Sequence, residues 1–207
     1  AGTYEIKISG TFPRIYFNRT KDAQKIIEIV NWGTNPWVSM EKAFDGCSNL
    51  VVSATDIPDM SIVTNCYAMF YGCDGLAIQD FTGWDMSAVT DMGLMFYDCD
   101  NVTSLDLSGW DTSSLLLTND MFEQCRLLTT LNLSGWDMSG VTNMRDMFNE
   151  CRSLVTLNMS GWTNPSSVTT LTKTFNDCYL LTSLDLSGWD VSNVTSMYET
   201  FRDCSVL

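Results

Sequence analysis

The sequence has no histidine, and only 11 of its 207 residues are lysine or arginine against 25 acidic ones, a net charge of −14. Without histidine the chain has no Ser-His-Asp or Cys-His triad, no histidine general base and no histidine-ligated metal site. An acidic surface repels phosphate backbones, which argues against nucleic-acid binding. No run approaches the ~20 apolar residues of a membrane-spanning helix. These absences argue against common catalytic sites, nucleic-acid partners and membrane insertion.

Against these absences stands a surplus of 8 cysteine, 12 methionine and 7 tryptophan residues. Cysteine, phenylalanine and tryptophan recur together every 26 residues, with one step of 27 near Asn164 and Pro165. The recurring positions are Cys47, Cys73, Cys99, Cys125, Cys151, Cys178 and Cys204; Phe44, Phe70, Phe96, Phe122, Phe148, Phe175 and Phe201; and Trp84, Trp110, Trp136, Trp162 and Trp189. Such a period is typical of a solenoid in which each repeat is one coil.

Each unit predicts a short helix followed by a short strand. Met92, Met95, Phe96 and Cys99 follow the spacing i, i+3, i+4, i+7, which predicts one buried stripe on a helix of about two turns. Apolar and polar residues then alternate over residues 130–136 in the next unit, as in a strand with one buried face. An Asp-x-Ser turn closes the unit, because the aspartate can accept hydrogen bonds from backbone N–H groups two residues on.

Residues 1–26 break the period and predict an N-terminal β cap. Alternation over residues 3–8 predicts one strand, Gly10 and Thr11 a turn, and residues 15–17 a second strand. The segment carries five basic and two acidic residues, so its net charge is +3 and that of the remaining chain is −17. We expect residues 1–26 to cover the open edge of the first coil and residues 27–207 to form the solenoid.

At the other end the sequence stops in mid-repeat, at residues 204–207. A solenoid end without a cap exposes core side chains and unpaired strand edges. We therefore expect either that this is a piece of a longer chain or that another subunit covers the end, and we favour the first.

The strand half of the unit reads LxxLxLxxW over residues 128–136 and 181–189, the leucine-rich-repeat strand with tryptophan where asparagine or cysteine is usual. The whole unit, MF-x-x-C-x-x-L-T-x-L-x-L-S-G-W-D-x-S-x-V-T-x-M, resembles the BspA-like leucine-rich-repeat surface proteins over about residues 40–207. Pro58 departs from the tryptophan position, and Gln79 and Phe81 replace strand leucines, so we expect less regular packing there.

This resemblance implies an α/β fold class: a leucine-rich-repeat-like solenoid of about seven 26-residue strand–turn–short-helix coils with a small β N-terminal cap. It also implies a cell-surface or secreted protein that adheres to host proteins or other cells. In leucine-rich repeats the outward strand face is usually concave and often binds ligands. The ligand-binding candidates on that face are Ser104, Asp106, Ser108, Thr130, Asn132, Ser134, Thr156, Asn158, Ser160, Ser183, Asp185 and Ser187.

A small polar sheet of this kind can form hydrogen bonds to a protein or a glycan. Three alternatives stay open: a solvated face without a ligand, ordered water as in ice-binding solenoids, and recognition by the helix side. The helix side varies more between units, as residues 123–124, 149–150 and 202–203 show.

No metal site and no cofactor are predicted. Each cysteine lies one coil from the next on the buried stripe, not at Cys-x-x-Cys spacing, so we expect buried free thiols, with occasional disulfides or a metal as alternatives. Acidic columns suggest calcium as a further alternative, but no Asp-x-Asp-x-Asp-Gly loop occurs and turn capping explains the first column. The columns are Asp111, Asp137 and Asp190, and Asp106, Asn132, Asn158 and Asp185.

The sequence therefore predicts a binding or adhesion module that recognises a protein or glycan on another cell or host surface through the solenoid surface. No nucleophile–base pair stands out from the repeats, so we expect no enzyme activity. The alternative is a structural stalk or spacer, or a phage tail-fibre-type receptor-binding segment carried on a phage virion.

Overall fold

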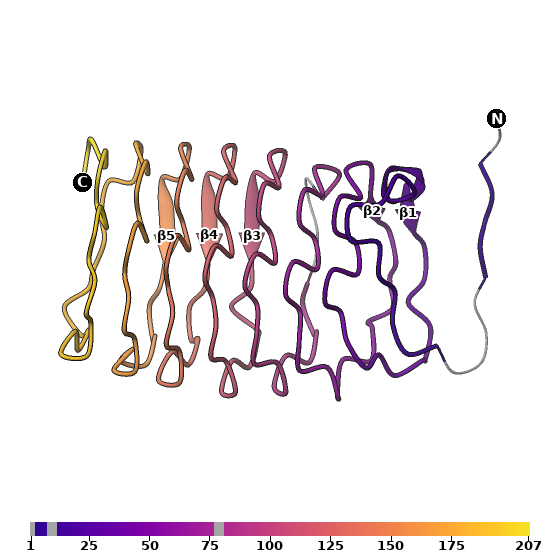
Figure 1. Cartoon of the computed structure of the whole chain (residues 1–207), viewed down its shortest axis with the longest axis horizontal. Helices are drawn as coiled ribbons and strands as arrows, with labels where there is room; N and C mark the ends of the chain where they lie inside the picture. The colour runs from indigo at the N-terminus through magenta and orange to yellow at the C-terminus, as the bar shows by residue number, and fades with distance from the viewer. Residues whose placement is uncertain (1–2, 8–11, 77–80) are drawn as a thin grey trace.

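The computed structural model describes residues 3–7, 12–76 and 81–207. The chain winds into coils that stack along the long axis of a rod, with the N-terminal segment and Leu207 at opposite ends (Figure 1). Residues 26 positions apart lie beside each other, as the pairing of Leu105 with Leu131 and of Leu131 with Leu157 shows. The repeat solenoid is thus confirmed, and the total of about seven coils stays a prediction.

Parallel strands form one wall of the rod, which we call the strand wall (Figure 1). One sheet pairs β1 with β2, and a second has the order β3-β4-β5. Alternate residues face inward, so Leu105 and Leu131 are buried while Ser104 and Thr130 are exposed. The strands are β1 (Glu28–Ile29), β2 (Val51–Val52), β3 (Ser104–Asp106), β4 (Thr130–Asn132) and β5 (Thr156–Asn158).

A second wall is formed by single parallel bridges, which we call the bridge wall. From Asn65 on, each bridge joins one residue to its equivalent in the next coil with the same 26-residue step, apart from the 27-residue step between Asn143 and Thr170. The first bridge, between Pro36 and Asp59, spans 23 residues. The regularly spaced bridged residues are Asn65, Asp91, Leu117, Asn143, Thr170 and Ser196.

The predicted helix is wrong, and with it the α/β class. No α-helix occurs in the described residues, whose helical element is the 3-10 turn η1 (Ala23–Lys25). Instead, residues 92–99 form successive turns, and we call this segment and its equivalents in other coils the turn ribbon. The Leu94 N–H donates to the Asn119 carbonyl oxygen of the next coil at 3.0 Å, while the Met95 N–H closes a turn on the Met92 carbonyl oxygen at 3.2 Å.

The helical pattern arose because turns of three and four residues also place Met92, Met95, Phe96 and Cys99 inward, where all four are buried. In a helix each N–H would bond to the carbonyl four residues earlier. Here the next coil supplies the acceptor, and a pattern read within one repeat cannot distinguish the two arrangements.

Two positions in each turn ribbon have a left-handed backbone, such as Leu94 and Asp98, both with a φ of 56°. The two columns are Lys42, Ala68, Leu94, Asp120, Asp146, Lys173 and Glu199, and Gly46, Gly72, Asp98, Gln124, Glu150, Asp177 and Asp203. A left-handed backbone costs a non-glycine residue about 1–2 kcal/mol. Hydrogen bonds between coils and burial of the apolar side chains must offset this repeated strain.

The core is a set of side-chain columns along the rod axis. Rings of adjacent members of the phenylalanine column, from Phe44 to Phe201, stack with centroids 5.4–5.8 Å apart. The tryptophan rings stack from Trp110 to Trp189 with centroids 6.0–6.5 Å apart. The Trp136 Nε1–H donates to the Leu107 carbonyl oxygen at 2.9 Å. A hydrogen bond of this kind satisfies the indole N–H, which would otherwise be an unpaired polar group inside the core.

The columns are less regular where Pro58 replaces tryptophan. Pro58 is buried, and Trp32 and Trp84 meet edge to face there with ring centroids 5.4 Å apart. Phe81 is buried and also makes edge-to-face contacts with Trp84 and Trp110. Gln79 lies outside the described residues.

The N-terminal segment packs on the first coil, but not as a β cap. Residues 3–7 and 15–17 form no strand, and Ile8, Gly10 and Thr11 lie outside the described residues. Backbone hydrogen bonds extend the walls instead: the Val38 N–H donates to the Pro13 carbonyl oxygen, and the Arg19 N–H donates to that of Asp45, both at 2.9 Å. A division of the chain at residue 26 stays a prediction.

Arginine side chains strengthen this contact. Arg14 Nη2 donates to the Glu41 carbonyl oxygen at 3.2 Å, and Arg19 Nε pairs with Asp45 Oδ1 at 2.9 Å. The positive segment thus meets the carbonyl edge of the first turn ribbon, where partial negative charge gathers.

Among the described residues, no helix has the length and the apolar character that a membrane span requires.

Replacing Gly72 with alanine distinguishes a turn ribbon from a helix. Gly72 has a φ of 62°, and a Cβ there would meet no atom within 4 Å, so only backbone strain opposes the change. The turn ribbon predicts that Gly72→Ala lowers the free energy of unfolding by about 1–2 kcal/mol. In a helix the same change would raise it by roughly 0.5–1 kcal/mol. Urea unfolding measures the difference.

Gly109→Ala is the matched control, because a Cβ at Gly109 also has open space and its backbone is not left-handed. We expect that change to stay within about 0.5 kcal/mol of the wild type. A neutral or stabilising Gly72→Ala would contradict the turn ribbon.

Candidate functional site

The strand wall brings most of the sequence-predicted site residues together. Ser104, Thr130 and Thr156 are paired in register across β3, β4 and β5. Asp106, Asn132 and Asn158 are paired in the same way, and Ser108, Ser134 and Ser160 follow two residues later. Whether this face binds a ligand stays a prediction.

The fourth predicted row does not join the sheet. Ser183, Asp185 and Ser187 are exposed, but the sheet ends at β5 and none of the three lies in a strand. Asp185 only caps its own turn, through a hydrogen bond from the Ser187 N–H at 2.9 Å. The candidate face is therefore three strands wide where four rows were expected.

A ladder of hydrogen bonds runs through the centre of this face. Asn158 Nδ2 donates to Asn132 Oδ1 at 2.9 Å, and Asn132 Nδ2 donates to Asp106 Oδ1 at 3.0 Å. The same oxygens accept hydrogen bonds from backbone N–H groups two residues on, such as that of Ser108 at 3.1 Å. Hydrogen bonds from the Ser108 hydroxyl, the Ser108 N–H and the Asn132 amide hold the pKa of Asp106 below its usual value. The ladder fixes these side chains, so the row of Asp106, Asn132 and Asn158 uses its polar atoms to hold the coils together.

The hydroxyl row beside the ladder is different. Ser104, Thr130 and Thr156 are exposed, and within the described part of the chain their hydroxyls form no hydrogen bond. They lie one coil apart on a fixed sheet. This row places three unbonded hydroxyls in register on the sheet, where they can meet a ligand.

The cysteine column is structural. All eight cysteines are free thiols, and seven of them are buried. Cys125 Sγ donates to the Phe96 carbonyl oxygen at 3.0 Å, and Cys99 and Cys151 make the equivalent bonds. Burial raises the pKa of Cys125 to about 12. Because metal ligation and disulfide exchange both need the thiolate, these groups are held in their inert form.

Thiol labelling tests this assignment. We expect native protein at neutral pH to react slowly with a thiol reagent, with partly exposed Cys204 reacting first and the buried cysteines only after unfolding. A count against time in native buffer and in denaturant gives the result. Several rapidly labelled cysteines in native protein would contradict it.

The acidic columns proposed for calcium cap turns. Asp111, Asp137 and Asp190 each accept a hydrogen bond from the backbone N–H of the serine two residues on, at 2.9–3.0 Å. Hydrogen bonds with those serines, and for Asp137 also with Thr163, lower the pKa of these carboxyls. Turn capping, the explanation preferred from the sequence, therefore accounts for their position.

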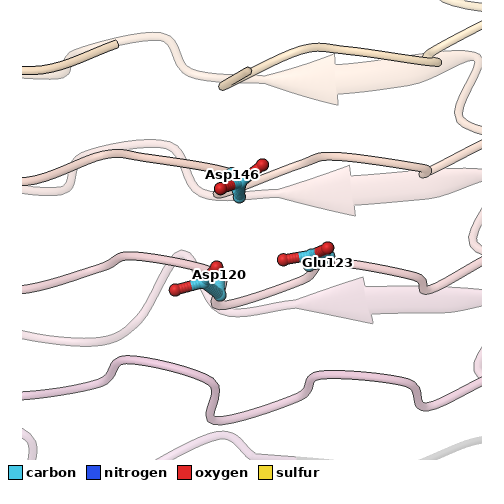
Figure 2. Close-up of side chains that lie close together, drawn as sticks. All are labelled: Asp120, Glu123 and Asp146. Atoms are coloured by element: carbon cyan, nitrogen blue, oxygen red, sulfur yellow. The ribbon is translucent and has the colours of Figure 1, made fainter. Parts of the chain in front are cut away.

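The structure instead brings together three carboxylates on the turn ribbon that the sequence did not single out (Figure 2). Asp120 and Glu123 come from one coil and Asp146 from the next, with an oxygen of each within 4.8 Å of the others. Asp120 and Asp146 are 26 residues apart and so fall in one column, which was the available signal in the sequence. It was missed because the segment was expected to be helical.

Each carboxylate in this cluster already has a polar neighbour. Asn119 Nδ2 donates to Asp120 Oδ2 at 2.8 Å, and Asn149 Nδ2 donates to Glu123 Oε1 at 3.0 Å. Asp146 is buried, and Arg145 Nε lies 2.8 Å from its Oδ2. Burial together with Asp120 and Asp146 raises the pKa of Glu123 to about 8, and burial raises that of Asp146. Oxygen ligands of this kind suit calcium. A proton on Glu123 is an alternative way to relieve the repulsion among the three carboxylates.

The raised pKa of Glu123 predicts a pH dependence. A carboxyl whose pKa is higher in the folded state adds stability below its unfolded pKa, and this is lost as pH rises through about 8. We expect Glu123→Gln to behave like the wild type near pH 4, below the unfolded pKa of about 4.5, and to melt at a higher temperature than the wild type near pH 9. Thermal unfolding at both values measures this.

Glu5→Gln is the control, because Glu5 lies on the exposed N-terminal segment and its loss should change the melting temperature little at either pH. If wild type and Glu123→Gln differed equally at both values, the shared-proton explanation would be wrong.

Solved structures with a similar chain path are leucine-rich-repeat proteins. One from T. pallidum is 19% identical with a TM-score of 0.46, covering 86% of this chain and 87% of that one. One from Bacteroides ovatus ATCC 8483 is 19% identical with a TM-score of 0.43, covering 86% of this chain and 46% of that one. A leucine rich cell surface protein from Faecalibacterium prausnitzii A2-165 is 14% identical with a TM-score of 0.26, covering 87% and 81%. At these scores the similarity carries no functional argument.

A comparison with curated proteins finds no match. Membership of the BspA-like family stays a prediction, because the family that matches the sequence is a different one. The match extends over residues 38–153 and 126–207, which is most of the chain. The chain belongs to the family described as Mycoplasma protein of unknown function, DUF285.

Proposed function

We propose that this chain is a non-enzymatic binding module of a surface or secreted protein, and that the strand wall over β3, β4 and β5 recognises a protein or a glycan. The observation that carries the proposal is the exposed hydroxyl row of Ser104, Thr130 and Thr156. Strands in a sheet lie about 4.8 Å apart. Hydroxyls at that spacing can donate to and accept from successive groups of an extended polar ligand.

Rigidity supports this proposal. The Asp106–Asn132–Asn158 ladder fixes the centre of the face, and Leu105 and Leu131 anchor the strands in the core. A ligand that meets such a face orders few side chains on binding, so little conformational entropy is lost. Recognition by many weak polar contacts on a rigid surface suits adhesion, where several molecules bind at once.

A spacer is the second candidate function, and the aromatic columns favour it. Ring stacking continues from Phe44 to Phe201, and backbone hydrogen bonds link the same coils. A rod built in this way resists bending and can hold another part of a protein away from a surface. A spacer needs no ligand on the strand wall.

Substitutions on the two walls separate these functions. Thr130→Trp places a bulky side chain in the hydroxyl row, and Thr142→Trp makes the same change at an exposed threonine next to the bridge wall. Immobilised glycans and purified extracellular-matrix proteins serve as probes. We expect Thr130→Trp to weaken capture at least about tenfold, the loss of one to two polar contacts, and Thr142→Trp to leave it unchanged.

Both variants should melt close to the wild-type temperature. Thr130 is exposed with an unbonded hydroxyl, and Thr142→Trp removes one exposed hydrogen bond, from the Thr142 hydroxyl to the Leu116 carbonyl oxygen at 3.3 Å. Loss of capture in Thr142→Trp alone would move the binding site to the other wall. If the wild type captures none of the probes, the spacer is the better account.

A further inference from the structure

The N-terminal segment covers the first coil on two sides and leaves a third open. Pro13 extends the bridge wall through its bond from Val38, and Arg19 extends the turn ribbon through its bond to Asp45. On the strand wall, β1 has one neighbour, β2. Its other edge has no strand partner among the described residues.

The backbone groups at this edge can be identified from the pairing. The carbonyl oxygens of Ile27 and Ile29 accept hydrogen bonds from the N–H groups of Val51 and Ser53, at 2.9 and 3.0 Å. Since alternate residues of a parallel strand bond to opposite sides, the N–H and C=O groups of Glu28 and Val30 face away from β2. Val30 is 54% exposed. This edge is therefore a template for another strand.

Residues 3–7, which we call the arm, are the described segment that the chain leaves unpacked. All five are exposed, and Tyr4 and Ile6, at 85% and 76%, are the most exposed large apolar side chains described. Tyr4 and Ile6 alternate with Glu5 and Lys7. Glu5 and Lys7 form an ion pair with each other at 3.4 Å. Figure 1 shows the arm as an extended stretch beside the end of the rod that carries β1.

We propose that the arm docks on the free edge of β1 in its own chain as an added strand and closes the N-terminal end of the solenoid. The alternation of Tyr4 and Ile6 gives the arm one apolar face, which can pack beside the exposed Ile27 and the half-buried Ile29 on the core side of β1, and it leaves Lys7 on the opposite side, where Glu28 lies. Its Lys7 carries the charge opposite to the exposed Glu28. Docking satisfies the backbone of Glu28 and Val30 and removes an edge that could pair with other molecules.

The arm of the same chain is the favoured occupant because it is tethered close by. The Phe12 N–H donates to Asn35 Oδ1 at 3.0 Å, and the Phe12 and Trp37 rings pack edge to face. The chain is thus anchored on the first coil a few residues after the arm. Tethering of this kind gives the arm a high effective concentration at the edge, which a second copy reaches only in concentrated solution.

Amide hydrogen exchange of the full chain, read by NMR at Glu28 and Val30, tests the proposal. Ile6→Asp places a charge in the centre of the apolar face of the arm, and Glu5→Gln changes its opposite face. We expect Ile6→Asp to speed exchange at Val30 on the order of tenfold or more, and Glu5→Gln to leave it unchanged. Exchange at the centre of the rod, at Leu131, should be the same in all three proteins.

Equal exchange at Val30 in the wild type and Ile6→Asp would overturn the proposal. Light scattering on the same samples decides whose arm is bound, and we expect the mass of one chain. Protection at Val30 that appears only together with the mass of two chains would also overturn it, because the arms would then be exchanged between copies.

Discussion

Backbone N–H groups in the turn ribbon of each coil bond to carbonyl oxygens of the coil that follows. Leu94 bonds to Asn119, Asp120 to Arg145 and Asp146 to Thr172, at 2.8–3.0 Å. This requires successive coils to keep the same length between bonded positions. The extra residue near Asn164 and Pro165 is tolerated because it lies between the strand wall and the bridge wall, and the step from Asn143 to Thr170 absorbs it. The period, the side-chain columns and the left-handed positions all follow from this bonding.

Because equivalent residues of successive coils lie beside each other, the repeat also determines which polar side chains are neighbours on the surface. Amides suit a column because each can donate to one neighbour and accept from another, as Asn158 and Asn132 do. Carboxylates in neighbouring coils lack that option and repel each other. The cluster of Asp120, Glu123 and Asp146 shows the consequence, because burial and the two neighbouring carboxyls together raise the pKa of Glu123 to about 8. Arginines relieve the same repulsion elsewhere, as Arg126 does between Asp98 and Asp100.

Much of the solenoid could be predicted from the sequence, because period and burial are properties of the repeat itself. The phenylalanine, cysteine and tryptophan columns and the register of β3, β4 and β5 follow from a 26-residue step. The short helix could not be distinguished from turns, since both bury Met92, Met95, Phe96 and Cys99. For the site, the rows on the strand wall were predictable. The bonding of Asn132 to Asp106 and the end of the sheet at β5 depend on contacts between coils, which no single repeat records.

The central claim is that hydrogen bonds between coils replace those of a helix. NMR couplings across hydrogen bonds between the amide nitrogen and carbonyl carbon test it most directly in isotope-labelled protein. The account predicts a coupling from the Leu94 N–H to the Asn119 carbonyl, 25 residues later in the chain. A coupling from Leu94 to the carbonyl of Thr90, four residues earlier as in an α-helix, would contradict it.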